Sequence, residues 1–412
     1  MRCFNPFPVI RADLRRNQLL AWVTVLLVAL SVASGIAVIS QERALRQGSA
    51  RAADDFDVLV GAPGSGTQLV LSTVYLQSQA IPLLDGDVLL QASAAAGVNY
   101  AAPIAFGDNW QGHPIVGTSA DFASRGGKLA PAQGRVFQKR GEAVIGAAVP
   151  LAIGAVFSPA HGSQRAPEDE PGHADAAHGG LTYTVVGRLP ARNTIWDKAI
   201  LVPVEDVWSV HGLSGSHAGE TTPHIGPPWS TRQLPGVPAI AIKPDSVAAA
   251  YQLRGQFRST RSLALFPAEV LNDLYLTLGN IRDVMSVLVI TTQLLVLAAV
   301  LMALLVGFLA RRRQFAVLRA IGASRLYVFC VVWIEVLLLI VSGAVMGCLL
   351  GWFSSTALSH WMQSQVGFAM PVRLGATEAL LVAALLLLGA LVATLPAWLV
   401  FRRPIAEGLV SG

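Results

Sequence analysis

Histidine and carboxylate side chains gather in two segments of the chain, and both residue types can bind metal. The segments, residues 158–180 and 211–238, are rich in glycine, proline and serine and poor in apolar residues. Imidazole and carboxylate groups suit Zn²⁺, but the spacing matches no structural zinc motif and there is no H-E-x-x-H sequence. The sequence therefore leaves two interpretations, a loose metal-binding tract or a polar loop. The histidines concerned are His161, His173, His178, His211, His217 and His224.

Motifs typical of an enzyme are missing from the sequence. Residues 61–68 have the glycines of a phosphate-binding loop, but Thr67 stands where that motif needs lysine, which favours a turn. Residues 41–283 contain no cysteine, and no G-x-S-x-G sequence supplies a serine nucleophile. We expect a protein that is not itself an enzyme and binds no cofactor directly.

A basic segment at residues 311–325, RRRQFAVLRAIGASR, combines arginines with a short apolar face formed by Phe315, Leu318 and Ile321. Its periodicity predicts a short amphipathic helix, which Gly322 can end in a left-handed conformation while Ser324 caps the next helix. The alternative is a basic loop that only sets topology or touches anionic lipid. The candidate site residues are Arg312, Arg313, Gln314, Phe315, Leu318, Arg319, Gly322 and Ser324.

The elements that position these residues are membrane spans. The chain is 53% hydrophobic and 13% charged, against roughly 25% charged residues in soluble domains. Four apolar stretches exceed the ~20 residues that cross a bilayer, and the first is too long for a cleaved signal peptide. The fold class expected is an α-helical membrane protein with four transmembrane helices plus a large mixed α+β extracytoplasmic domain between helices 1 and 2. The spans are residues 19–40, 284–310, 326–353 and 378–401.

Arginines predict the orientation of these spans. They are concentrated in residues 1–18, 311–325 and 402–412, which the positive-inside rule places in the cytoplasm, so both termini are inside. Residues 41–283 and 354–377 are then outside. The net charge of +5 reflects this topology, and we expect the lipid bilayer rather than nucleic acid as its partner.

The external segment shows mixed strand and helix patterns. Residues 181–187, 199–204 and 237–242 predict strands. Helical spacing from Leu271 to Met285 predicts a helix that runs unbroken into span 2, and residues 41–53 can prolong span 1 outward.

Span 3 carries one acid and a glycine repeat. Gly343, Gly347 and Gly351 lie on one helix face, which suits close packing within the chain or dimerisation. Placing the Glu335 carboxylate in a membrane costs free energy, so this residue is a functional candidate. It has either a structural and signal-transmitting role, which we favour, or a role as a proton relay.

Two stretches resemble the FtsX-type permease family, which includes MacB, LolC and LolE. Residues 311–325 are similar to the family's loop between spans 2 and 3, with Gln314 replacing a frequent glutamate, and residues 396–407, PAWLVFRRPIAE, are similar to its C-terminal ending. The resemblance implies a membrane subunit of an ABC transporter in the cell inner membrane. ATP would be hydrolysed on a separate cytoplasmic subunit, docked on residues 311–325, and would drive work of the external domain on a substrate by export, extraction or mechanotransmission.

The same resemblance implies further partners. Two copies, as a homodimer or as a heterodimer with a related permease, would sit over two ATPase subunits, and an extracytoplasmic accessory or substrate-binding protein is a further candidate partner. Residues 57–62 and 68–74 also resemble a subset of these permeases in zinc-responsive transport operons. The alternative function is therefore zinc-related transport or metal sensing through the histidine-rich loops.

Overall fold

The computed structural model describes residues 5–77, 79–161, 181–213, 224–229 and 234–402. The chain divides into two compact units. The helical unit comprises Met1–Gln47, Leu278–Met362 and Met370–Gly412, and the sheet unit comprises Gly48–Thr277 and Gln363–Ala369. The division falls inside three long helices, so each of these helices belongs in part to both units.

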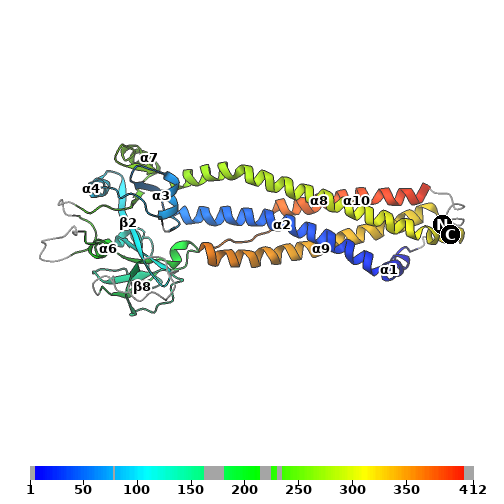
Figure 1. The fold of residues 1–412 in the computed structure, drawn as a ribbon, viewed down its shortest axis with the longest axis horizontal. Helices are drawn as coiled ribbons and strands as arrows, with labels where there is room; N and C mark the ends of the chain where they lie inside the picture. Colours follow the sequence, from blue (N-terminus) through cyan, green and yellow to red (C-terminus); the bar gives the residue numbers. More distant parts are fainter. Residues whose placement is uncertain (1–4, 78, 162–180, 214–223, 230–233, 403–412) are drawn as a thin grey trace, which may run out of the picture. The chain divides into compact units, whose positions relative to one another are not determined.

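The helical unit is built from long apolar helices that lie side by side (Figure 1). Within the described residues, four helices are long and apolar enough to cross a membrane, in Gln18–Ala53, Asp283–Gly307, Arg325–Gln363 and Ala376–Leu395. The expected four spans, with a mixed sheet domain between the first and the later ones, are confirmed. The helices are α1 (Phe7–Arg16), α2 (Gln18–Ala53), α8 (Pro267–Ala320), α9 (Arg325–Val366) and α10 (Ala376–Arg402).

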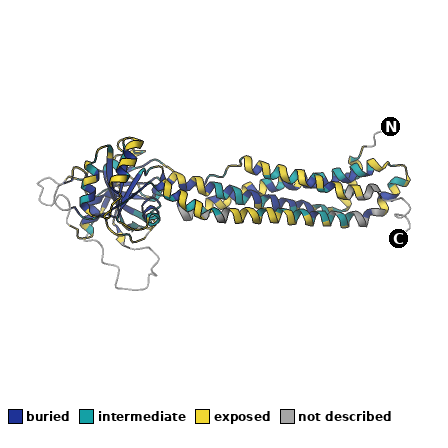
Figure 2. Cartoon of the chain, turned by 90° about the horizontal axis from the view of Figure 1, so that it is seen from above, coloured by how far each residue is buried: buried dark blue, intermediate teal, exposed yellow. Residues whose placement is uncertain are grey.

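Hydrogen bonds from side chains to backbone carbonyl groups join these helices. The Gln293 amide on α8 donates to the Ser31 carbonyl on α2 over 2.7 Å, and the Trp333 indole on α9 donates to the Ala390 carbonyl on α10 over 3.2 Å. Apolar side chains fill the interior, while many on the outer faces stay exposed (Figure 2). Such outward-facing apolar surface is what a lipid environment requires.

The sheet unit contains one mixed sheet. Its path among the described strands runs β11-β1-β10-β2-β3-β9-β5-β8-β4, with β6 on β8 and β7 on β2. The pairs β3–β9 and β5–β8 are parallel, and the other pairs are antiparallel. The strands are β1 (Val58–Gly61), β2 (Val98–Trp110), β3 (His113–Thr118), β4 (Gln133–Gly134), β5 (Glu142–Ile145), β6 (Val156–Phe157), β7 (Ala160–His161), β8 (Tyr183–Arg188), β9 (Ile200–Pro203), β10 (Ala239–Pro244) and β11 (Leu263–Leu265).

Both faces of the sheet are buried, which explains why its central strands are apolar runs without polar alternation. In β1, Val58 and Val60 join one apolar core while Leu59 joins the other, because successive side chains of a strand point to opposite faces. Helices cover the faces. They are α3 (Gly66–Thr73), α4 (Gly86–Ala94), α5 (Ala120–Ala123), η1 (Ile195–Lys198), α6 (Val204–Val210) and α7 (Val247–Gln256).

The expected strands and helical extensions are present, as β8, β9, β10 and the outer ends of α2 and α8. Five details differ from the sequence predictions. Residues 311–320 continue α8 and are not a separate helix, α9 runs beyond Phe353 to Val366, α1 precedes the first span, and Ala160–His161 of the first predicted loop forms β7. Gly66 opens α3, so residues 61–68 include a strand end and a helix start rather than a turn alone. Two of these differences, in α8 and α9, are helices that continue past the hydropathy boundaries.

Candidate coupling site

The basic segment ends in a tight turn between α8 and α9. Gly322 has φ of +104°, in the left-handed region that favours glycine. The Ala323 N–H donates to the Leu318 carbonyl over 3.0 Å, and the Ser324 hydroxyl accepts from the Tyr327 N–H over 3.1 Å. The expected helix stop at Gly322 and cap at Ser324 are confirmed, so the turn holds a fixed geometry.

The predicted apolar face, Phe315, Leu318 and Ile321, is divided between the core and the surface. Phe315 is 6% exposed and packs in the bundle core with Val328 and Val332, and Leu318 is half-buried against the same core. Phe315 therefore does not face outward in the structure. It anchors the segment instead, because the unbroken helix turns this side toward α9.

Ile321 of the predicted face is exposed, together with two other apolar residues. Val317 is 47% exposed, Ile321 77% and Leu326 65%, and we call these three residues the coupling face. Arg313 and Gln314 are exposed beside it, while Arg319 is half-buried and makes a contact with the rest of the chain. Arg312 lies in α8, but its side chain is outside the described part of the structure. The segment thus has a buried anchoring side and an exposed side with apolar and basic residues.

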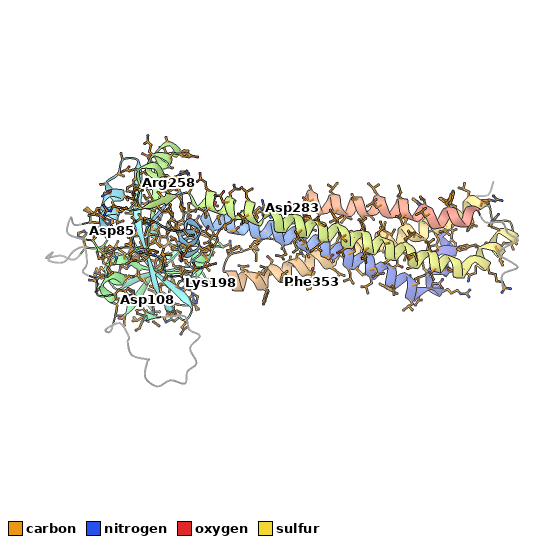
Figure 3. All side chains as sticks on the ribbon, turned by 45° about the horizontal axis from the view of Figure 1, so that its top comes forward. Asp85, Asp108, Lys198, Arg258, Asp283 and Phe353 are labelled. Carbon is orange, nitrogen blue, oxygen red and sulfur yellow. The ribbon has the colours of Figure 1, made fainter. Side chains whose placement is uncertain are left out.

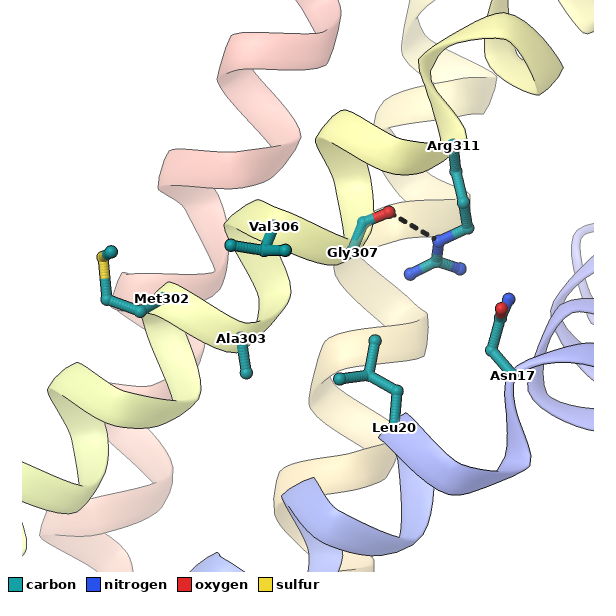
Figure 4. A pocket seen from close by; sticks show the side chains of 7 residues that line it. All are labelled: Asn17, Leu20, Met302, Ala303, Val306, Gly307 and Arg311. Carbon is teal, nitrogen blue, oxygen red and sulfur yellow. Dashed lines mark hydrogen bonds between the residues drawn. The ribbon is translucent and has the colours of Figure 1, made fainter.

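Arg311 ties the start of the segment to the bundle. Its guanidinium bonds the carboxylates of Asp13 on α1 and Glu335 on α9, the latter over 3.0 Å, and it donates to the Gly307 carbonyl over 3.1 Å. All three charged side chains are buried or nearly so. Beside Arg311 lies an apolar pocket of about 420 Å³ lined also by Asn17, Leu20 and Met302 (Figure 4). One guanidinium therefore joins three helices at one end of the bundle.

The glycine repeat of α9 packs against α2. A Cβ at Gly343 would lie 2.7 Å from Val28, and one at Gly347 would lie 2.7 Å from both the Ala29 carbonyl oxygen and Val32. At Gly351 it would lie 3.0 Å from Ile36. Of the two interpretations, packing within the chain is the one the structure supports, because α2 already occupies the glycine face.

The segment after α9 belongs to the sheet unit. The Ala369 N–H donates to the Asn193 carbonyl over 3.0 Å, Phe368 is buried beside Tyr75, and a Cβ on Gly48 would lie 2.7 Å from Phe368. Tyr275 of α8 bonds Ser49 of α2 in the same unit. Parts of α2, α8 and the α9–α10 connection therefore pack within the sheet unit. The sequence did not predict this packing for the α9–α10 connection.

The histidines divide between described and undescribed residues. His173, His178 and His217 lie outside the described residues. His211 Nε2 lies 4.0 Å from an oxygen of Asp108, which Figure 3 places in the sheet unit, and His224 Nε2 lies 3.3 Å from the Pro228 carbonyl oxygen. The register places His161 opposite Asp108 on neighbouring strands. Among the described residues, no three His, Cys, Asp or Glu side chains form a metal-binding group.

A buried acid fixes the described part of the second histidine segment. Glu205 on α6 accepts from the Gly226 N–H over 2.7 Å. Burial raises the pKa of the Glu205 carboxyl above its ordinary value, and the Gly226 hydrogen bond opposes this rise. His224 lies two residues before Gly226, which this side-chain contact holds.

Two acids that form inter-helix ion pairs were missed from the sequence. Asp13 is the acid among the arginines before span 1, and this isolated charge was the available signal for its pairing with Arg311. Glu378 at the start of α10 bonds Arg43 of α2 over 3.0 Å. A carboxylate at one end of an apolar helix could have indicated such an inter-helix ion pair.

Comparison with known proteins gives a family match for the C-terminal part of the chain. Residues 285–405 match the family model "FtsX-like permease C-terminal", which confirms the resemblance found in residues 311–325 and 396–407. No curated protein sequence matches the chain.

Two solved structures are similar to part of the chain. One is the periplasmic region of MacB from Actinobacillus actinomycetemcomitans, at 10% identity, covering 54% of this chain and 93% of that one with a TM-score of 0.32. The other is the extracellular domain of the noncanonic ABC-type transporter YknZ from Gram-positive bacteria, at 10% identity, covering 51% and 98% with a TM-score of 0.28.

Proposed function

We propose that this FtsX-like permease is the membrane subunit of an ABC transporter, which converts ATP hydrolysis on a separate cytoplasmic subunit into movement of its sheet unit. In this proposal the permease is in the inner membrane with both termini in the cytoplasm. It binds no ATP itself, and it acts on a substrate outside the membrane by export, extraction or mechanotransmission.

The observation that carries the proposal is the two-sided segment at the end of α8. Its inner side is fixed to the bundle by Phe315 and by the Arg311 ion pairs. Its outer side exposes the coupling face beside arginines. A protein surface that is apolar, basic-rimmed and rigidly backed suits docking of a partner. Force applied there would pass directly into α1, α8 and α9.

Helix continuity supports transmission away from this segment. α8 contributes Phe315 to the core of the helical unit and Leu271 to a core of the sheet unit, without an interruption of the helix. α2 likewise continues to Ala53, which is buried in the same sheet-unit core. A helical shift at one end would be transmitted as a hinge or shear change. We further propose that two permeases, identical or related, act over two ATPase subunits, with an extracytoplasmic accessory protein as a further partner.

The coupling face provides the test. Val317→Asp with Ile321→Asp places two carboxylates on exposed positions, where substitutions change stability by about 0.5 kcal/mol or less. We expect the variant to fold normally but to recover roughly tenfold less ATPase subunit than wild type when the tagged permease is purified from its host in mild detergent, because burying unpaired charges at an interface costs several kcal/mol. Mass spectrometry and an ATPase assay of the eluate measure the loss.

The matched control is Val247→Asp with Tyr251→Asp, which adds the same charges to exposed residues of α7 in the sheet unit. The amount of ATPase subunit that co-purifies with this control should equal the amount recovered with wild type. Equal recovery with both double variants would contradict docking on the coupling face.

A second candidate function is zinc capture or sensing by the sheet unit. The observation that favours it is the placement of His211 within 4.0 Å of Asp108, with His161 opposite Asp108 in the strand register. An imidazole beside a carboxylate is a pair of ligand types that suits Zn²⁺.

Calorimetry on the purified full-length protein tests this zinc proposal. We expect Zn²⁺ binding that His211→Ala weakens at least tenfold, since the substitution removes the imidazole beside Asp108. The control His224→Ala should leave binding unchanged. Absence of Zn²⁺ binding to wild type would refute the zinc proposal and would leave the transporter proposal unchanged.

A further inference from the structure

We propose that the groove between α1, α2 and α9 is a binding site for one phospholipid with an anionic headgroup. One acyl chain lies in the apolar groove, and the headgroup phosphate is bound by Arg11 and Arg15. The inference depends on the helical unit alone and stands apart from the proposed transport function.

The groove has the size and lining of a site for an apolar chain. Its volume is about 660 Å³, within the roughly 300–1,000 Å³ of ligand sites in proteins. Buried Ile10, Val25 and Leu339 form its floor, one from each helix. The other lining residues are Phe7, Arg11, Leu14, Arg15, Gln18, Ala21, Trp22, Leu338, Ser342 and Met346.

The spacing along α1 separates an apolar wall from a basic rim. Ile10 and Leu14 line the groove, and Arg11 and Arg15 follow each of them by one residue. Residues four apart in a helix lie one turn apart on the same face. The two guanidinium groups are thus a turn apart at the edge of the groove, where one phosphate can accept from both.

The charge around the groove favours an anion. Arg11 and Arg15 are exposed, and no carboxylate partner for either is found among the described residues. The one acid of α1, Asp13, is already bonded to Arg311. The rim is therefore positively charged, and a zwitterionic headgroup would satisfy it less well than an anionic one.

The position of α1 selects a lipid as the occupant. α1 is an amphipathic helix directly before an apolar span, which places it at the membrane interface. Phe7 and Trp22, on the groove lining, are 58% and 65% exposed, and exposed aromatic residues are typical of that interface. At this depth the molecule with an apolar chain and an anionic head that is present at high concentration is a phospholipid.

Native mass spectrometry of the full-length protein tests the site. The protein in detergent is titrated with dioleoyl-phosphatidylglycerol and, separately, dioleoyl-phosphatidylcholine. We expect one phosphatidylglycerol to bind preferentially to wild type. Arg11→Gln with Arg15→Gln should weaken it roughly 25-fold, because an arginine near an anionic lipid surface contributes about fivefold in affinity.

The matched control is Arg16→Gln with Arg313→Gln, which removes the same charge from exposed residues that do not line the groove. It should keep nearly wild-type affinity. Ser342→Trp fills the groove from its α9 wall and should remove the bound lipid while leaving both arginines in place. Equal weakening by the two arginine variants, or equal binding of the two lipids by wild type, would overturn the proposal.

Discussion

Replacing Gly347 by valine is expected to separate α2 from α9 and to lower the stability of the helical unit severely. A Cβ at this position would lie 2.7 Å from the Ala29 carbonyl oxygen and from the Val32 side chain, and valine adds two methyl groups beyond it. Overpacking of this kind costs about 1–3 kcal/mol even where neighbours can relax. Here one neighbour is backbone of another helix, so the helix itself must move.

Thermal unfolding of the purified protein, followed by tryptophan fluorescence, measures the effect. Gly347→Ala should give a smaller loss than Gly347→Val, because it adds only the Cβ. The control is Gly279→Val on α8, where a Cβ meets no described atom within 4 Å. A wild-type melting temperature for Gly347→Val would show that α2 does not occupy the glycine face.

Removing the Arg311 guanidinium is expected to be more damaging than removing either of its partners. Arg311→Met leaves the Asp13 and Glu335 carboxylates in buried positions without a counter-charge. Loss of one partner of a buried ion pair costs about 3–5 kcal/mol. We expect Arg311→Met to reduce the yield of folded protein and its melting temperature, whereas the exposed Arg313→Met should change neither.

The partner variants distinguish the roles of Glu335. Glu335→Gln removes one of two carboxylates that share a single guanidinium, so it should be nearly neutral for stability and should restore part of what Arg311→Met loses when the two are combined. A structural role predicts that Glu335→Gln keeps ATPase coupling. A proton relay predicts loss of coupling with unchanged stability, and that result would contradict the structural role.

The arrangement of the spans and domain was predictable from the sequence because hydropathy and charge act locally. An apolar stretch of sufficient length must be a helix in a bilayer, since its backbone groups can bond only within the helix. This physics determined the four spans and the helical approach of residues 271–285. It also determined the turn at Gly322 and Ser324, because a left-handed conformation and an N-cap depend on neighbouring residues alone.

Which side of a helix is buried was not predictable, because this depends on residues distant in sequence. Phe315, Val317 and Ile321 are all apolar in one helix, and the contact with α9 decides that Phe315 is buried while the other two are exposed. The packing of α2 against α9 likewise decided that the glycine face contacts α2.

The sequence by itself determined the four apolar spans and the turn at Gly322 and Ser324, and it singled out residues 311–325 as a candidate docking segment. Tertiary structure alone decided the Asp13–Arg311–Glu335 network, whose members lie on α1, α8 and α9, and the insertion of Phe368 into the sheet unit. The physical reason is that burying a charge or an aromatic ring is favourable only with a partner close in space, and sequence patterns with helical period do not specify which distant residue that partner is.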